Sequence, residues 1–227
     1  MLDVPVSQAR IQRFYSDAAP VYDDFTDEHE AAAKARAIAL LARRQGERYL
    51  EVATGTGKTF AQVIAESGAE GVVGVDMAPG MIAVARTRLR EQGCDATPLQ
   101  LGDARALPFG DERFDCLFNS YMLDLIPTDE IPQVVAEFWR VLRPGGRLVL
   151  VNLTEGEGDD EAFSSDWKAR YEREPEALGA CRPVLATAMV EAQGFVGVER
   201  QYSGHGESWP SEIVVARRPG GGNEGVS

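Results

Sequence analysis

The chain has 227 residues, which is enough for one sizeable α/β domain or at most two small ones. It is 44% hydrophobic, 26% charged and 8% aromatic, a composition typical of folded globular proteins and not of disordered ones. Its 36 acidic and 23 basic residues give a net charge of −13, which disfavours nucleic-acid phosphates and anionic membrane surfaces as partners.

The sequence also bears on where the protein works. No apolar run approaches the roughly 18–20 residues that cross a bilayer, so we expect no stable membrane insertion. Residues 1–5 lack the basic and apolar regions of a secretory signal. The three cysteines are odd in number and widely spaced, which fits neither a disulfide framework nor a zinc site: Cys94, Cys116 and Cys181. We therefore expect a cytoplasmic protein without a metal.

The N-terminal part of the chain is predicted to be helical. Apolar residues recur there at helical spacing, and an alanine-rich stretch predicts a helix over residues 28–44. We expect residues 1–46 to form a helical lid and residues 47–218 to form the main domain. Within it, residues 154–183 are expected to be an insertion at the acceptor site, and residues 219–227 a disordered tail.

Predicted strands and helices alternate over the main domain. Seven short stretches bounded by turn residues predict strands, over residues 48–53, 71–75, 99–101, 114–119, 147–152, 195–202 and 213–216. Helices are predicted up to about Ser67, from Pro79, over about 128–142 and near 184–193. Such alternation implies right-handed crossovers and a doubly wound α/β fold. The sheet is expected to be seven-stranded and mostly parallel, with a C-terminal antiparallel strand.

Polar side chains are predicted at the ends of four strands, where open parallel sheets bind their ligands. A turn with Gly55 and Gly57 follows the first strand, and glycine lets the backbone turn tightly and approach a ligand. Asp76 ends the next strand about 20 residues after Gly55, the spacing at which a carboxylate binds a ribose diol. Asp103 and Asn119 end the third and fourth strands. We expect Asp76 and Asp103 to face one common cavity.

Each of these residues also has a purely structural interpretation. The two glycines could form a plain turn, and Asp76 could cap the helix that begins at Pro79. Asp103 could form an Asx turn, and Asn119 could cap its strand. Polar groups at four strand ends together favour the ligand site.

The glycine turn excludes one nucleotide motif and disfavours another. A phosphate loop needs a glycine five residues before Gly57, where Val52 stands as part of the strand. A dinucleotide fingerprint needs a third glycine three residues after Gly57, where Phe60 stands. An NAD(P)-dependent oxidoreductase is therefore kept as an alternative, beside a non-catalytic binding module of the same fold.

The pattern resembles the class I S-adenosylmethionine-dependent methyltransferases over residues 49–153. Residues 51–57 are similar to their first motif, whose leading acid reaches the cofactor's amino group and whose glycines meet its methionine part. Residues 73–76 resemble the second motif, which ends in the ribose-binding acid. Residues 102–104 are similar to the adenine-contacting segment. Residues 140–147 resemble a loop of the branch that methylates ubiquinone and menaquinone precursors.

This resemblance implies a Rossmann-like fold and S-adenosyl-L-methionine as the cofactor. It implies cofactor contacts from the strand ends and from a tyrosine that helps to close the pocket: Tyr22, Glu51, Ala53, Thr54, Gly55, Gly57, Asp76, Met77, Asp103, Ala104 and Asn119. It implies in-line methyl transfer to a small-molecule acceptor, a quinol, phenol, thiol or amine. The acceptor does not follow from the branch, because residues 25–36 keep His29 but lack the asparagine, histidine and tryptophan pattern of its quinone enzymes.

A general base is needed only if the acceptor must lose a proton. Tyr121 and Asp124 are candidates because they follow the fourth strand, where the acceptor is expected to lie. His29 and His205 are candidates in segments outside the central sheet that are expected to form the lid. The sequence leaves the oligomeric state open.

Overall fold

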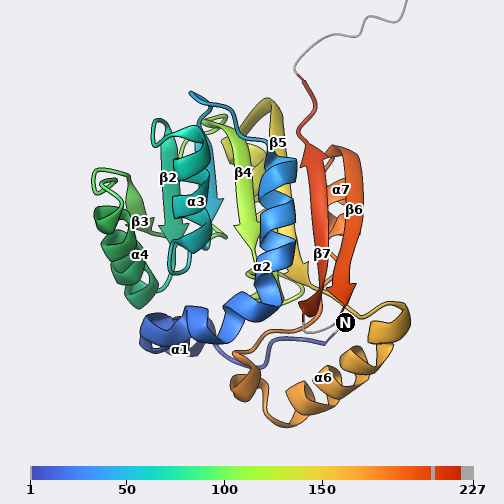
Figure 1. Ribbon diagram of the computed structural model, residues 1–227. Coiled ribbons are helices and arrows are strands. Elements are labelled where there is room, and N and C mark those ends of the chain that lie inside the picture. Colours follow the sequence, from blue (N-terminus) through green and yellow to red (C-terminus); the bar gives the residue numbers. More distant parts are fainter. Residues whose placement is uncertain (1, 206–207, 221–227) are drawn as a thin grey trace, which may run out of the picture.

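Seven strands form one sheet, in the order β3-β2-β1-β4-β5-β7-β6 (Figure 1). The computed structural model describes residues 2–205 and 208–220. The strands are β1 (Tyr49–Val52), β2 (Val72–Asp76), β3 (Leu99–Leu101), β4 (Phe114–Ser120), β5 (Leu142–Leu153), β6 (Val196–His205) and β7 (Ser208–Arg217). Neighbours are parallel, except that β7 runs antiparallel to β5 and β6. This confirms the predicted mostly parallel sheet with a C-terminal antiparallel strand.

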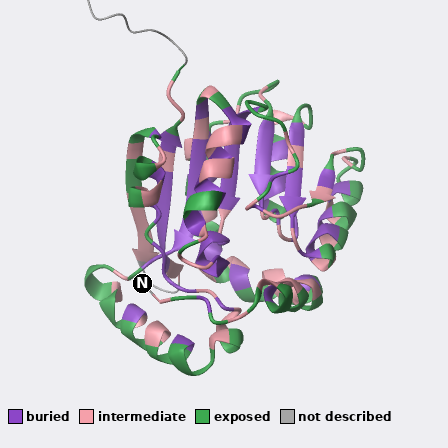
Figure 2. Cartoon of the chain, turned by 180° about the vertical axis from the view of Figure 1, so that it is seen from behind, coloured by how far each residue is buried: buried purple, intermediate pink, exposed green. Residues whose placement is uncertain are grey.

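Helices cover both faces of the sheet, which explains why the central strands are apolar without alternation. The helices α2 (Tyr22–Leu41), α3 (Lys58–Ser67) and α4 (Pro79–Glu91) stand in front of the sheet in Figure 1. The opposite face packs against α5 (Ile131–Val141) and α7 (Thr187–Ala192). Seen from behind, the central strands are buried between the two helical layers (Figure 2). Within the described residues, every helix is too short or too polar to cross a membrane.

Further helices lie across the end of the sheet to which the arrows of β2 and β4 point (Figure 1). The chain enters through α1 (Gln8–Ala18) and the 3-10 helix η1 (Ala19–Val21). The remaining ones are η2 (Leu123–Leu125), η3 (Gly158–Asp160), α6 (Glu161–Arg173) and η4 (Pro175–Leu178). The helix α1 packs tightly on α4, because a Cβ at Gly80 would lie 2.1 Å from the carbonyl oxygen of Ser16. Glycine at position 80 therefore allows α1 to dock over this end of the sheet.

The helix predicted over residues 28–44 is shifted in the structure. It starts at Tyr22 and stops before Ala42, which adopts a left-handed conformation with φ of 45°. Arg43 leaves the helix because its guanidinium donates a hydrogen bond to the carbonyl of Ser67 at the end of α3, at 3.0 Å. A contact distant in sequence thus decides where α2 ends.

The C-terminal part also departs from the predicted bounds. The final hairpin is longer than predicted, because β6 and β7 pair as far as His205 and Ser208. Residues 154–183 contain α6, a helix that no clear apolar period predicts. Of the predicted tail, residues 221–227 lie outside the described part of the chain.

Candidate active site

The carboxyl ends of β1, β2 and β4 lie at one level, because Val52 is in register with Val75 on one side and with Asn119 on the other. A cavity of about 150 Å³ lies between these ends and the helices α1 and α2. Several residues with a predicted site role line it: Tyr22, Glu51, Ala53, Thr54, Gly55, Asp76, Met77 and Tyr121. The structure therefore brings residues from four separate segments to one place.

The turn between β1 and α3 has a backbone that favours glycine. Gly55 and Gly57 have φ values of 57° and 76°, and Ala53 holds 58° although it carries a Cβ. A Cβ at Gly57 would lie 2.8 Å from the Cβ of Ala85, so a side chain there would push α4 away. Gly57 thus supports the turn from behind, whereas Gly55 and the strained Ala53 line the cavity. Backbone strain of this kind tends to be kept at functional sites.

Asp76 is oriented by two backbone amides. Its Oδ1 accepts a hydrogen bond from the N–H of Ala78 and its Oδ2 one from the N–H of Gly55, each at 2.8 Å. A carboxylate oxygen can accept two hydrogen bonds, so each oxygen keeps capacity for a ligand hydroxyl. Burial raises the pKa of Asp76, and the backbone amides offset part of that rise. The side chain can therefore receive two adjacent hydroxyls at the cavity wall.

Glu51 is buried more deeply than Asp76, with 2% of its surface exposed against 7%. The phenol of Tyr49 donates a hydrogen bond to its Oε2 at 2.6 Å. Burial raises the pKa of Glu51 to about 8, although the Tyr49 bond and the charge of Lys34 lower it in part. A ligand ammonium in the cavity would favour the ionised carboxylate.

Asp103 does not face the cavity, so the prediction that it shares one with Asp76 is wrong. Its carboxylate is bound by Arg105, whose Nε and Nη2 donate to it at 2.9 and 2.6 Å. The backbone N–H of Arg105 also donates to its Oδ1 at 2.9 Å, which is an Asx turn. The Asx turn matches the structural interpretation of Asp103, and its role as a cofactor contact stays a prediction.

Ala104 and Asn119 do not line the cavity either. The side-chain amide of Asn119 donates to the carbonyl of Val52 at 2.8 Å, so it joins the ends of β4 and β1. This bond matches its alternative role at the strand end, and its role as a cofactor contact stays a prediction.

The four candidates for a base are placed very differently. Tyr121 lines the cavity, has φ of 49°, and its hydroxyl lies 2.8 Å from that of Ser211. Asp124 is fully buried and lies behind the cavity wall. The ring of His29 stacks on that of Trp209, with 4.9 Å between the ring centroids, and His29 does not line the cavity. The side chain of His205 lies outside the described part of the structure.

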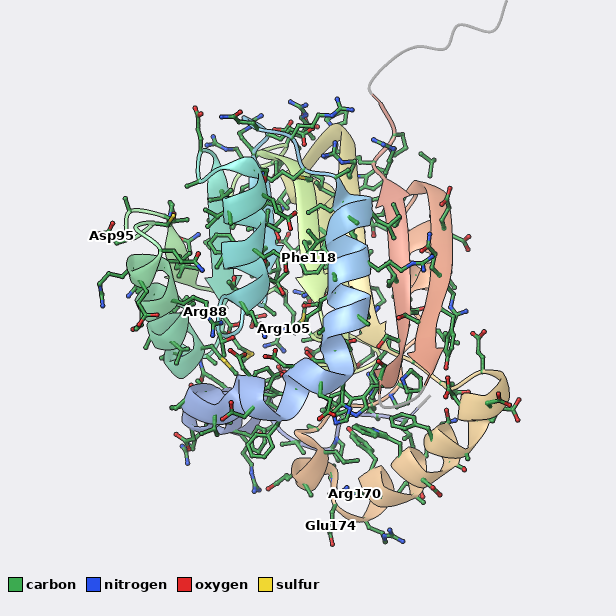
Figure 3. The ribbon with its side chains drawn as sticks, in the orientation of Figure 1. Arg88, Asp95, Arg105, Phe118, Arg170 and Glu174 are labelled. Carbon is green, nitrogen blue, oxygen red and sulfur yellow. The ribbon has the colours of Figure 1, made fainter. Side chains whose placement is uncertain are left out.

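The start of α2 is tied across the cavity by contacts that the sequence did not indicate. Asp23 accepts hydrogen bonds from the hydroxyl of Thr56 and from the guanidinium of Arg88, both at 2.6 Å. Asp27 pairs with Lys58. Arg88, labelled in Figure 3, comes from α4, and Thr56 comes from the turn after β1. These partners are distant in sequence, so no local spacing could have revealed them.

An ion pair from the middle of α2 also reaches the cavity. Lys34 lines it, bonds to the buried Glu30 at 2.5 Å and lies 5.4 Å from the ring centroid of Tyr121. The i,i+4 spacing of Glu30 and Lys34 predicts an ion pair. That spacing does not reveal that the pair faces a cavity, because helical position alone does not show which face is covered.

The strand order, the glycine turn and the acid at the end of β2 define a Rossmann-like domain of the kind that binds nucleoside cofactors. A family described as "Methyltransferase domain" matches residues 50–146, which run from β1 into β5. This match supports a class I S-adenosylmethionine-dependent methyltransferase domain over that stretch of the chain. This confirms the class that the sequence motifs predicted.

Curated relatives agree with this class. The chain is 34% identical over 143 residues to the demethylmenaquinone methyltransferase of Thermus thermophilus, a match covering 61% of this chain and 64% of that protein. It is 30% identical over 167 residues to the arsenite methyltransferase of Halobacterium salinarum, covering 71% of this chain and 40% of that protein. The chain thus spans less than two thirds of the length of either relative.

Solved structures show the same fold. The [4+2]-cyclase SpnF superposes with a TM-score of 0.73 at 19% identity, covering 97% of this chain and all of that one. The geranyl diphosphate C-methyltransferase of Streptomyces coelicolor has a TM-score of 0.68 at 13% identity, covering 90% of this chain and 98% of that one. Identities this low establish the fold alone, and the two names show that this fold serves more than one reaction.

Proposed function

We propose that this protein transfers a methyl group from S-adenosylmethionine to a small-molecule acceptor in the cytoplasm. The observation that carries the proposal is a single cavity in which a deeply buried acid, Glu51, and an amide-oriented acid, Asp76, lie on either side of the Gly55 turn. This is the arrangement that a cofactor with an ammonium group and a ribose requires. The family match supports the same cofactor.

The cofactor would lie along the strand ends. Its ribose hydroxyls would bind Asp76, its ammonium group would bind Glu51, and its methionine part would follow the backbone near Gly55. The adenine would extend toward Met77 and not toward Asp103, because only the first of these lines the cavity. The sulfonium would then lie between the strand ends and α2.

Methyl transfer mainly requires the acceptor atom, the methyl carbon and the sulfur to be in line, because the sulfonium already makes the methyl carbon electrophilic. Holding donor and acceptor in line can supply on the order of 7–11 kcal/mol of the barrier. Tyr15 and Tyr22 line the cavity with ring centroids 5.8 Å apart, and their faces can attract the sulfonium. We propose that α1 and α2 act as a lid that excludes water once both substrates are bound.

The acceptor would be a quinol, phenol, thiol or amine. The part of the cavity next to β4 is aromatic and apolar, formed by Tyr121, Met122 and Leu125. Such a wall supports a flat ring, and the similarity to a demethylmenaquinone methyltransferase points the same way.

Calorimetry with S-adenosylhomocysteine, followed by label transfer, tests the proposal. We expect the protein to bind S-adenosylhomocysteine and to move a deuterated methyl group to a member of a panel of quinols, phenols, thiols and amines, read by mass spectrometry. A folded protein that binds neither S-adenosylmethionine nor S-adenosylhomocysteine would refute it. Binding without transfer to any member would instead favour a non-catalytic module.

A nicotinamide-dependent oxidoreductase is the weaker alternative. Phe60 occupies the position of the third glycine and is fully buried. The centroid of its ring lies 6.1 Å from that of Tyr49. The close approach between helix and sheet that the third glycine provides is therefore blocked. A rise in melting temperature with NADH but none with S-adenosylhomocysteine would revive this alternative.

A further inference from the structure

The cavity is lined by more acids than bases. The charged side chains that line it are Asp23, Asp27, Lys34, Glu51, Lys58 and Asp76. The cofactor would bring a carboxylate of its own into these surroundings, on the same carbon as the ammonium group. A carboxylate placed among other carboxylates is repelled unless a cation receives it. Among the described residues that line the cavity, the two lysines offer such a cation.

Lys58 lies at the solvent side of the cavity. Its side chain is 55% exposed, and its ammonium pairs with Asp27. This pair joins the start of α3 to the second turn of α2. The charge of Lys58 thus already has an acidic partner, and water screens it.

Lys34 is less exposed, and two contacts fix its ammonium. Its side chain is 24% exposed, and its Nζ donates a hydrogen bond to the buried carboxylate of Glu30 at 2.5 Å. The same nitrogen lies 5.4 Å from the ring centroid of Tyr121. An ammonium has three hydrogens to donate, and among the described residues Glu30 is its one hydrogen-bond partner. Two donors of Lys34 therefore remain for water or for a ligand.

The surroundings of Lys34 on α2 leave room for a ligand group. Ala31 and Ala35 also line the cavity, and they lie four residues apart on one face of the helix. Their methyl side chains do not extend past the Lys34 ammonium. A carboxylate can therefore approach this wall of the cavity from the side of the strand ends.

The contacts of Lys34 place it near the expected amino-acid end of the cofactor. Tyr121 follows β4, which pairs with β1, the strand that carries Glu51. Asp76 ends β2, on the other side of β1. Burial raises the pKa of Glu51 to about 8, and the charge of Lys34 is among the effects that lower it in part. The lysine thus lies on the side of the ammonium and not on the side of the ribose.

We infer that Lys34 binds the carboxylate of the cofactor's amino-acid part, while Glu51 binds the ammonium on the same carbon. This inference rests on the proposed function and deepens it, because it makes Lys34 a residue that determines cofactor specificity. A cation and an anion side by side recognise a zwitterion and disfavour nucleosides that lack one or both of its charges. The protein should therefore prefer S-adenosylhomocysteine to its decarboxylated form and to methylthioadenosine.

Decarboxylated S-adenosylhomocysteine tests the inference, because it lacks the carboxylate and keeps the ammonium. We expect the native protein to bind S-adenosylhomocysteine about tenfold or more tightly than the decarboxylated analogue, since a charged hydrogen bond is lost. Lys34→Gln should reduce this preference to about twofold or less, through weaker binding of S-adenosylhomocysteine. The charge of Lys34 also acts on Glu51, but Glu51 meets the ammonium that both ligands share, so this effect cancels in the ratio. Calorimetry measures the dissociation constants.

Lys168→Gln is the matched control, because it is the same change on a lysine of α6 that pairs with Glu155 outside the cavity. It should keep the full preference for S-adenosylhomocysteine. Equal affinities for the two ligands in the native protein, or an undiminished preference in Lys34→Gln, would overturn the inference. A preference that is lost in Lys58→Gln and kept in Lys34→Gln would overturn it in favour of Lys58. Failure of both ligands to bind the native protein would instead refute the proposed function.

The native protein provides a second measurement that does not depend on a variant folding. The chain has three lysines, Lys34, Lys58 and Lys168, so their acetylation by acetic anhydride can be followed separately by mass spectrometry of peptides. At equal saturation, S-adenosylhomocysteine should slow the acetylation of Lys34 more than the decarboxylated analogue does, because its carboxylate engages the ammonium. The other two lysines should react at the same rate with either ligand. Equal protection of Lys34 by the two ligands contradicts the inference.

Discussion

Asp76 and Asp103 both follow a strand of the parallel sheet, yet their neighbours give them different roles. Asp76 is followed by backbone amides that hold its carboxylate at the cavity wall. Asp103 is followed by Arg105, which binds both of its oxygens outside the cavity. At the scale of a residue, a strand-end carboxylate can bind a ligand only if its own chain leaves it capacity to do so.

Exchange of each acid for its amide separates the two roles. Asp76→Asn should weaken S-adenosylhomocysteine binding about ten- to a hundredfold, because the charge and one acceptor oxygen are lost. Asp103→Asn should leave the affinity within about twofold, because the residue lies outside the cavity. Calorimetry measures both constants, and comparable losses in the two variants would contradict the placement of the ribose.

Glu51 makes cofactor binding depend on pH. Its pKa of about 8 means that a carboxyl largely protonated at neutral pH has to ionise to meet the cofactor's ammonium. Affinity for S-adenosylhomocysteine should therefore rise with pH, by up to about tenfold per unit below 8, with release of a proton on binding. Titration calorimetry in buffers of different ionisation enthalpy measures that proton.

Two variants check that Glu51 is the group responsible. Glu51→Gln should bind more weakly and lose the pH dependence, because no proton is left to release. Tyr49→Phe should shift the rise in affinity for S-adenosylhomocysteine to higher pH. The reason is that the phenol favours the ionised carboxylate of Glu51 through a 2.6 Å hydrogen bond. An unchanged pH profile in Glu51→Gln would assign the effect to another group.

At the scale of elements, α2 is built in two halves. Its C-terminal half packs Ala33, Ala37 and Leu41 into the core that covers one face of the sheet. Its N-terminal half crosses the cavity and is held there through Asp23 and Asp27. The cavity of about 150 Å³ is smaller than the roughly 300 Å³ at which ligand pockets usually begin. We propose that the N-terminal half moves when a cofactor enters.

Loss of the Arg88 contact should make that movement easier. Arg88→Gln should raise the dissociation rate of S-adenosylhomocysteine a few-fold, in keeping with the modest strength of a partly exposed ion pair of about 0.2–1 kcal/mol. Arg90→Gln, at an exposed position of the same helix, should leave the rate unchanged. Stopped-flow displacement measures both rates, and equal rates would mean that Asp23 and Arg88 do not limit opening.

At the scale of the whole molecule, the sheet order places three strand ends under one pair of N-terminal helices. β1 lies between β2 and β4, so residues from the first, second and fourth strands converge although they are far apart along the chain. The whole molecule also carries an excess of negative charge, because the acidic residues outnumber the basic ones by 36 to 23.

That excess should make stability depend on salt. Charges of one sign repel one another in the compact state, and added salt screens the repulsion. We expect the melting temperature to rise between about 0.01 and 0.5 M sodium chloride, where screening changes most. Scanning calorimetry measures the shift, with sucrose as a control for effects that do not involve charge. A melting temperature that falls with salt would show that ion pairs outweigh the net charge.

Sequence alone determined the alternation of strands and helices, the parallel sheet and the glycine turn, because these depend on residues close together in the chain. It also placed Glu51 and Asp76 correctly at the ends of adjacent strands. The local sequence did not show that the side chain of Arg105 would bind the carboxylate of Asp103, since an Asx turn and a ligand contact both fit the same residues.

Only the tertiary structure decided which residues face the cavity. Arg43 ends α2 by binding the end of α3, and Arg88 ties Asp23 across the cavity from another helix. Asp124 is fully buried only because segments distant in the chain pack around it. Contacts of this kind join segments whose separation in sequence carries no period or spacing, so they exist only once the chain has folded.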